Sequence, residues 1–247
     1  MKLKRIKEIK GKITLKTGLH VGAGDSEMRI GGTDNPVIKH PFTQEPYIPG
    51  SSIKGKVRSL LEMKYGLMRV TKGEPVKLEH LKEDKKDKSA NSKNLEKFDD
   101  NDKKNAEKIM KLFGAGASSD DDLKEIAEKI GPTRVSFADC PLDKDWNKDA
   151  KEKHYPLVEV KSENTINRIT GTAQHPRFVE RVPASAQFEF CVSLKIMEED
   201  QGHGIEELLR EGLRLLEQDA LGGSGSRGYG RIKFEPEIEE FADTDAP

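Results

Sequence analysis

Residues 187–196 read QFEFCVSLKI, and this stretch decides the fold. The apolar residues Phe188, Phe190, Val192, Leu194 and Ile196 alternate with polar or small ones. Such alternation is typical of a half-buried β-strand, because successive side chains point to opposite faces of a sheet. The stretch therefore predicts a strand with one face in a hydrophobic core.

Weaker patterns on both sides of it predict the remaining elements of a sheet. Residues 12–16, 133–140 and 231–234 favour strands, and apolar residues recur at helical spacing in 51–64 and 204–219. Ser51 and Ser52 are candidate N-caps of the first helix. The order strand, helix, strand, strand, helix, strand predicts an α+β ferredoxin-like fold, which is also the scaffold of RNA-recognition modules.

Three segments are expected to depart from that core, which spans 1–70 and 131–240. Residues 71–130 form an insertion, densely charged over 76–108, with short amphipathic helices at 106–113 and 123–130. We expect this insertion to be a charged helical lid outside the core. Residues 155–183 predict a protruding, basic β-hairpin. The acidic tail, 235–247, is expected to be frayed.

Composition limits the classes of function. The chain of 247 residues is 35% charged with a net charge of −1, so it is not a uniformly basic nucleic-acid binder, and RNA contacts need local clusters of Lys and Arg. Cys140 and Cys191 lack Cys-x-x-Cys partners, which argues against a zinc knuckle or a disulfide framework. No apolar run approaches the roughly 20 residues of a membrane span. We expect a cytoplasmic protein without a membrane partner.

Two segments have features that favour binding of a sugar-phosphate backbone. Lys54 and Arg58 stand four residues apart near the start of the first predicted helix, where the helix dipole favours an anion. The glycine-rich loop 222–230 carries Arg227 and allows close backbone approach, although such loops are often only turns. It lacks the Gly-Lys-Ser/Thr ending of a nucleotide-triphosphate loop.

Two residues have both a chemical and a structural interpretation. Asp34, within GGTDNP at 31–36, either opens a turn or offers a carboxylate that holds Mg²⁺ or assists proton transfer from a ribose 2′-hydroxyl. His20 either contacts RNA or is structural, and His175 is equally ambiguous.

Four segments together resemble the RAMP superfamily of CRISPR proteins: GLHVGAGD at 18–25, GGTDNPV at 31–37, YIPGSSIKG at 47–55 and GGSGSRGYG at 222–230. Within it, the chain is similar to the repeated backbone subunit of type III-A (Csm) effector complexes. This likeness extends through RITGTA at 168–173 and ERVP at 180–183.

The resemblance implies a modified RNA-recognition fold that stacks head to tail with other copies and other Csm subunits along a guide RNA. A thumb hairpin at about 164–182 would interrupt the duplex of guide and complementary target RNA. Asp34 matches the family's catalytic aspartate, which cuts target RNA at regular intervals with Mg²⁺ or another divalent cation. The expected RNA-binding residues are His20, Ser51, Ser52, Lys54, Arg58, Arg168, Arg177, Gly222, Gly223, Ser224, Gly225, Arg227 and Gly228. Two alternatives stay open: a non-catalytic RNA-binding scaffold, and a guide-RNA-processing endonuclease that uses a histidine as general base.

Overall fold

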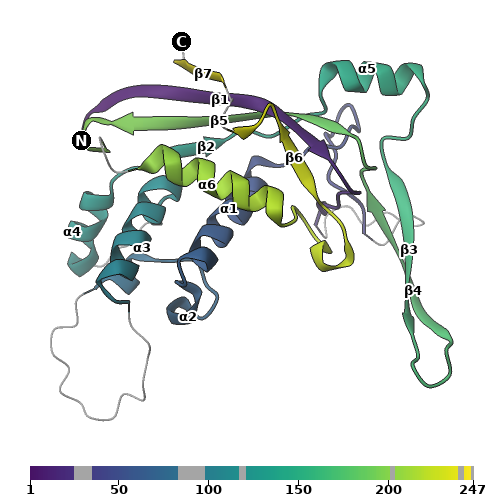
Figure 1. Ribbon diagram of the computed structural model, residues 1–247, viewed down its shortest axis with the longest axis horizontal. Helices are drawn as coiled ribbons and strands as arrows, with labels where there is room; N and C mark the ends of the chain where they lie inside the picture. The colour runs from purple at the N-terminus through teal and green to yellow at the C-terminus, as the bar shows by residue number, and fades with distance from the viewer. Residues whose placement is uncertain (25–34, 83–97, 117–120, 201–203, 239–241, 246–247) are drawn as a thin grey trace.

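The fold is built on one antiparallel sheet, shown in Figure 1. The computed structural model describes residues 1–24, 35–82, 98–116, 121–200, 204–238 and 242–245. The sheet order is β2 (Val135–Phe137), β5 (Gln187–Met197), β1 (Leu3–Leu15) and β6 (Ile232–Glu235). Helix α1 (Gly50–Lys64) connects toward β2, and α6 (Ile205–Gln218) lies between β5 and β6 in the chain. This arrangement confirms the ferredoxin-like prediction.

Strand β5 carries the centre of the core. Phe188, Phe190, Val192 and Leu194 are each at most 2% exposed, and each such side chain contributes about 1.5–3 kcal/mol by leaving water. The predicted alternation stops at Leu194. The ladder between β1 and β5 shifts register between Leu3 and Arg5 of β1, opposite Met197 and Ile196, and there Met197 is buried while Ile196 is half-buried. Such a β-bulge changes the direction in which the following side chains point.

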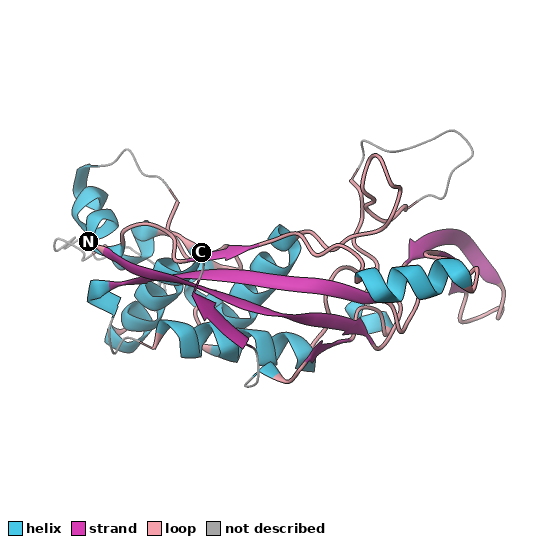
Figure 2. Ribbon diagram, turned by 90° about the horizontal axis from the view of Figure 1, so that it is seen from above, coloured by secondary structure: helices cyan, strands magenta, loops and turns pink. Residues whose placement is uncertain are grey.

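Helices cover one face of the sheet, as Figures 1 and 2 show. They are α1, α6, α3 (Asp100–Phe113) and α4 (Asp121–Ile130), with the short α2 (Met68–Thr71) and the 3₁₀ helix η2 (Leu78–Leu81) beside them. The expectation of a lid outside the core is wrong for the described part of the insertion. Ile109, Met110 and Phe113 of α3 belong to the same hydrophobic cluster as β5. Most of the charged stretch, residues 83–97, lies outside the described residues.

The predicted hairpin is present and projects away from the main sheet (Figure 1). Strands β3 (Glu159–Ile166) and β4 (Ala173–Arg181) form a separate two-stranded sheet within the predicted 155–183, and β3 begins before residue 164, which the resemblance gave as the start of the thumb. Helix α5 (Lys144–Glu152) precedes it and was not predicted. The side chain of Asp143 caps α5 by accepting from the Trp146 N–H.

The acidic tail is not frayed where the structure describes it. Strand β7 (Ala242–Asp245) pairs antiparallel with residues 7–10 of β1. Backbone pairing with the long β1 therefore orders this part of the tail. No helix in the described ranges is long and apolar enough to cross a membrane.

Candidate RNA interface

The start of α1 is built differently from the prediction. Ser51 and Ser52 lie inside the first turn, and the N-cap is Pro49, which makes no side-chain cap bond. The Gly50 N–H donates instead to Asp139 Oδ1 at 2.8 Å. A Cβ on Gly50 would lie 2.3 Å from the Phe137 carbonyl oxygen, so only glycine allows this close approach. The capping carboxylate comes from a residue 89 positions further along the chain.

Lys54 is the cation that remains available at this helix start. It is half-buried, and burial together with the nearby Arg58 lowers the pKa of its ammonium group. It forms no ion pair with any residue that the structure describes. Ser51 is exposed, and Ser52 is half-buried beside it. A phosphate at this position would relieve the unfavourable environment of the Lys54 charge.

Arg58 makes contacts within the fold that argue against the prediction that it binds a phosphate. Its Nε donates to Glu62 Oε1 at 2.8 Å, and its terminal nitrogens donate to the carbonyl oxygens of Gly114 at 3.2 Å and Val76 at 2.6 Å. These contacts tie α1 to the chain just before η2 and to the residue that ends α3. Arg58 is therefore a structural residue of the helical layer.

The glycine-rich loop lies directly against His20. Gly222 has φ +74°, and a Cβ there would lie 2.3 Å from the His20 carbonyl oxygen. The Gly223 N–H donates to that same oxygen at 2.9 Å. Ser224, Gly225, Arg227 and Gly228 form the tight 3₁₀ turn η4 (Gly225–Arg227) and its two caps. Glycine is required at Gly222 both for the positive φ and for the backbone contact.

Helix α1 and this loop share one end of the molecule. Lys56 of α1 pairs with Asp219, the residue that ends α6, at 2.6 Å. The loop begins three residues after Asp219, so the second turn of α1 adjoins it. The packing of α1 on α6 therefore places the Lys56 side of α1 near the start of the loop.

His20 is anchored to the base of the hairpin. Its Nδ1 lies 2.7 Å from the Glu180 carbonyl oxygen, and because a carbonyl only accepts, Nδ1 carries the proton. Its Nε2 has no hydrogen-bond partner among the described residues. The Glu180 carboxylate accepts from the Val37 N–H and from Lys39. The Glu180 N–H donates to the carbonyl of Asn35, which fixes the chain next to residue 34 against the hairpin.

Asp34 itself lies outside the described residues. Within the described ranges no group of three or more His, Cys, Asp or Glu side chains could hold a metal ion. The described residues therefore supply no ligand set of their own for Mg²⁺. A single carboxylate completed by phosphate oxygens and water is an arrangement that Mg²⁺ accepts.

The hairpin tip is exposed, and its base is charged. Ile169 is 97% exposed at the tip beside the exposed Arg168. At the base, Lys161, Arg177 and Arg227 surround the Glu163 carboxylate, at 3.8, 3.4 and 3.2 Å. We name these three cations and Glu163 the hairpin cation cluster. Of its members, the sequence predicted Arg177 and Arg227 as RNA ligands and missed Lys161 and Glu163.

Tyr229 joins the cluster to the glycine-rich loop. Its hydroxyl donates to Glu163 Oε1 at 2.9 Å, and its ring is fully buried. Burial alone raises the pKa of Glu163, but the Tyr229 hydrogen bond and the charges of Arg227, Lys161 and Arg177 hold it below its ordinary value. Glu163 therefore stays ionised at neutral pH.

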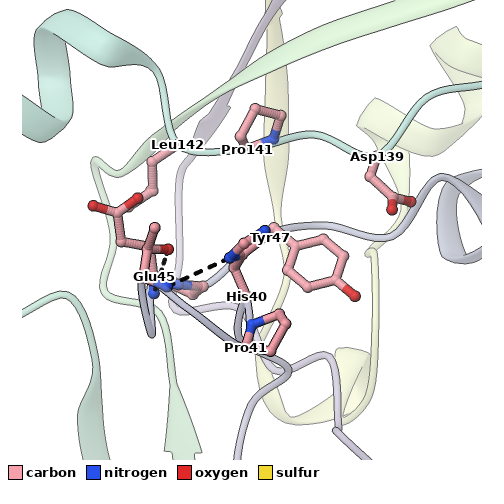
Figure 3. Close-up of a pocket in the computed structure, with 9 residues that line it drawn as sticks. His40, Pro41, Glu45, Tyr47, Asp139, Pro141 and Leu142 are labelled. Carbon is pink, nitrogen blue, oxygen red and sulfur yellow. Dashed lines mark hydrogen bonds between the residues drawn. The ribbon is translucent and has the colours of Figure 1, made fainter.

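A cavity of about 450 Å³ adjoins the interface beside the start of α1 (Figure 3). Its lining includes His40, Tyr47 and Leu142, with two carboxylates, Glu45 and Asp139. Asp139 caps α1, and Glu45 accepts from Asn147 and Lys151, which hold the pKa of Glu45 below its ordinary value. Both carboxylates are thus committed to structural bonds.

Comparisons with known proteins agree with this arrangement. The family model of the RAMP superfamily matches residues 12–233. The chain is 40% identical over 228 residues to a Methanocaldococcus jannaschii protein named CRISPR system Cms endoribonuclease Csm3, covering 92% of this chain and 77% of the relative. Proteins with the same name from Methanothermobacter thermautotrophicus and Streptococcus thermophilus are 37% and 38% identical, covering 92% and 90% of this chain and 82% and 84% of theirs.

Solved structures give the same result. A chain of the Csm3–Csm4 subcomplex of the type III-A CRISPR-Cas interference complex matches with a TM-score of 0.51 and 27% identity, covering 99% of this chain and 90% of that one. Csm3 from Methanopyrus kandleri has the same fold, with a TM-score of 0.55, 22% identity, and coverage of 93% and 75%. The chain therefore belongs to the RAMP superfamily, and within it to the Csm3 proteins.

Proposed function

We propose that this protein is a guide-RNA-binding backbone subunit of a type III-A CRISPR effector complex that cleaves complementary target RNA. The observation that carries the proposal is the meeting of the α1 start, the glycine-rich loop, His20 and the hairpin base at one end of the sheet. Lys56–Asp219, Gly223–His20 and His20–Glu180 contacts link these segments. The names of the relatives, which contain "endoribonuclease Csm3", support the catalytic part.

The guide strand would lie along the backbone of the glycine-rich loop and the first turns of α1. Lys54 would neutralise a phosphate there, while Ser51 and Ser52 would donate hydroxyl hydrogen bonds. Affinity of this kind is dominated by charge and falls as salt rises. Other copies of the chain, stacked head to tail, and other Csm subunits would complete the complex. The hairpin, with its exposed Arg168 and Ile169, would reach the duplex of guide and target.

Asp34 would promote cleavage of the target strand. Its neighbour Asn35 is bonded to Glu180, so the base of the hairpin holds the chain beside the carboxylate. A carboxylate next to a scissile phosphate assists removal of the 2′-hydroxyl proton. The 2′-oxygen attacks phosphorus, the bond from phosphorus to the 5′-oxygen of the next nucleotide breaks and that oxygen takes up a proton, which leaves a 2′,3′-cyclic phosphate on one product and a 5′-hydroxyl on the other. Mg²⁺ or another divalent cation would supply charge relief on the phosphate, with Asp34 as its ligand from this chain.

The test is Asp34→Ala in a reconstituted complex, measuring target cutting and target binding separately. We expect cutting to fall at least 100-fold, as for loss of one catalytic proton-transfer group, while binding stays within twofold. Asp149→Ala is the matched control, since Asp149 is a carboxylate on α5 that only pairs with Lys153. Unchanged cutting would remove Asp34 from the mechanism and leave a non-catalytic scaffold as the function.

Processing of guide RNA is a second candidate, favoured by one observation. His20 Nε2 is the ring nitrogen left without a described partner, so a neutral His20 offers a base next to the glycine-rich loop. Incubation of the purified protein with precursor RNA separates the two functions. Cutting by the protein alone, abolished by His20→Gln and retained in Asp34→Ala, would establish processing.

A further inference from the structure

The hairpin cation cluster joins two segments that are far apart in the chain. Lys161 and Arg177 come from β3 and β4, and Glu163 stands directly opposite Arg177 in their ladder. Arg227 comes from the glycine-rich loop. Three cations meet one carboxylate, so two positive charges are left without a counterion among the described residues. A surplus of this kind at one point attracts an anion.

Some hydrogen-bond donors of the cluster also lack an acceptor among the described residues. Glu163 Oε2 is buried and accepts no hydrogen bond, although Arg227 and Arg177 place Nε within 3.2 and 3.4 Å of it. The contacts are thus ion pairs without aligned N–H groups. The Arg177 guanidinium donates no hydrogen bond to any described residue, and its side chain is 49% exposed. Its planar fork of donors is available for a second anion.

The floor of the cluster is rigid. The buried Tyr229 ring lies beneath Lys161 Nζ at 4.6 Å and beneath the Arg181 guanidinium at 4.9 Å. Arg181 is itself held by Glu159 at 2.6 Å. Cation–π contacts and the Tyr229–Glu163 bond therefore hold the cations in place before a ligand arrives, which lowers the entropic cost of binding.

We propose that the hairpin cation cluster is a binding site for one RNA phosphate, called here the phosphate site. Lys161 and Arg177 are its ligands from the hairpin, and Arg227 is its ligand from the loop. Glu163 is a positioning residue. This proposal rests on the proposed function and adds a contact that ties the hairpin to the guide-binding loop. A phosphodiester fits better than an acidic protein surface, because the adjoining loop has small side chains that admit a sugar-phosphate backbone. A phosphate bound by both segments would restrain the hairpin relative to the loop.

The first test measures affinity of the full-length protein for a 20-nucleotide single-stranded RNA across a series of KCl concentrations. Each lost phosphate contact lowers the salt slope by about 0.7 for a single strand. Because all three cations share one phosphate, the triple Lys161→Gln, Arg177→Gln, Arg227→Gln variant is expected to lower the slope by about 0.7. Lys161→Gln alone leaves two cations at that phosphate, so it is expected to weaken affinity with a smaller change in slope. Lys129→Gln on α4, which removes a lysine paired with Glu107, is the control and should leave the slope unchanged.

The second test measures amide hydrogen exchange of residues 159–181 with and without the same RNA. RNA should slow exchange in the wild type and in Lys129→Gln, and should not do so in the triple variant. Glu163→Gln keeps an acceptor for Tyr229 but no longer gathers the cations, so we expect weaker affinity with the wild-type salt slope. Glu163→Asp should recover part of the affinity.

The outcomes separate this proposal from the function on which it rests. If the wild type shows no salt-dependent RNA affinity, the proposed function fails. If the wild type binds RNA and the triple variant keeps both the wild-type slope and the wild-type affinity, the phosphate site is refuted while the proposed function stands. If the triple variant loses self-association while its RNA affinity is unchanged, the cluster binds an acidic surface of a second copy. That outcome would also refute the phosphate site.

Discussion

Arg58→Ala is expected to destabilise the fold and to leave the RNA affinity of the folded protein unchanged. The guanidinium links Glu62 on α1 to the carbonyl oxygens of Val76, which precedes η2, and Gly114, which ends α3. Removing it leaves the Glu62 side chain, 4% exposed, with the Val76 N–H as its remaining described partner. A buried carboxylate that loses its cation is strongly unfavourable.

The magnitude follows from the burial of the pair. Breaking a buried ion pair costs about 3–5 kcal/mol, and the lower end applies because the Arg58 side chain is 19% exposed. In a chain of this size each kcal/mol lowers Tm by about 2–4 °C, so a loss of about 3 kcal/mol predicts a fall of about 6–12 °C.

Thermal melting and urea unfolding measure the loss of stability in Arg58→Ala. The salt dependence of binding to single-stranded RNA, measured below Tm, shows whether Arg58 contacts an RNA phosphate. The double variant Arg58→Met with Glu62→Leu removes both charges and should recover part of the stability, because the carbonyl oxygens of Gly114 and Val76 and the Val76 N–H still lose their partners. An unchanged Tm together with a salt slope lowered by about 0.7 would refute the structural role and restore Arg58 as a phosphate ligand.

Three further predictions concern stability. Gly222→Ala places a Cβ at positive φ and 2.3 Å from a carbonyl oxygen, so it should lower the free energy of unfolding in urea by about 2 kcal/mol and weaken RNA binding. Gly223→Ala is the control: the nearest atom to its Cβ would be 3.5 Å away, so its free energy of unfolding should be nearly unchanged. Asp139→Ala removes the acceptor for the first N–H of α1 and should cost about 1 kcal/mol. Burial alone would raise the pKa of Asp200, but the hydrogen bond and charge of Arg134 outweigh it and hold that pKa below its ordinary value. The stabilisation by the Asp200–Arg134 pair is therefore fully present above the pKa of Asp200 in the unfolded chain, about 3.9, and is lost as pH falls below it through the lower pKa of the folded state. Asp200→Asn should lower the free energy of unfolding by about 3 kcal/mol between pH 5 and 8. The difference in this free energy from the wild type should shrink below pH 4, and a constant difference down to pH 2 would contradict the prediction.

The sequence predicted elements whose pattern is local. The alternation in β5 and the helical spacing in α6 identify both elements without knowledge of their partners. Ala106, Ile109, Met110 and Phe113 lie on one helix face, and this spacing predicted an amphipathic helix. The sequence did not show that this face packs in the main core, because the dense charge before it favoured a lid outside the core.

The candidate site divides in the same way. The glycine-rich loop and His20 were identified by residue type, and the structure brings them together. The capping of α1 by Asp139 and the grouping of Lys161 with Arg227 depend on residues that meet only in the folded chain. The sequence shows a lysine and an arginine four residues apart but not the carbonyl groups that Arg58 contacts, so these contacts could not be predicted from it.

The most direct measurement of the RNA interface is photo-crosslinking of a 4-thiouridine-substituted guide RNA to the full-length protein, followed by mass spectrometry of the linked peptides. Crosslinks are expected in peptides that contain residues 18–22, 50–55, 159–181 and 222–231, at the end of the sheet from which the hairpin projects. Crosslinks confined to the opposite end, in the first residues of β1 and in α3 and α4, would contradict the account.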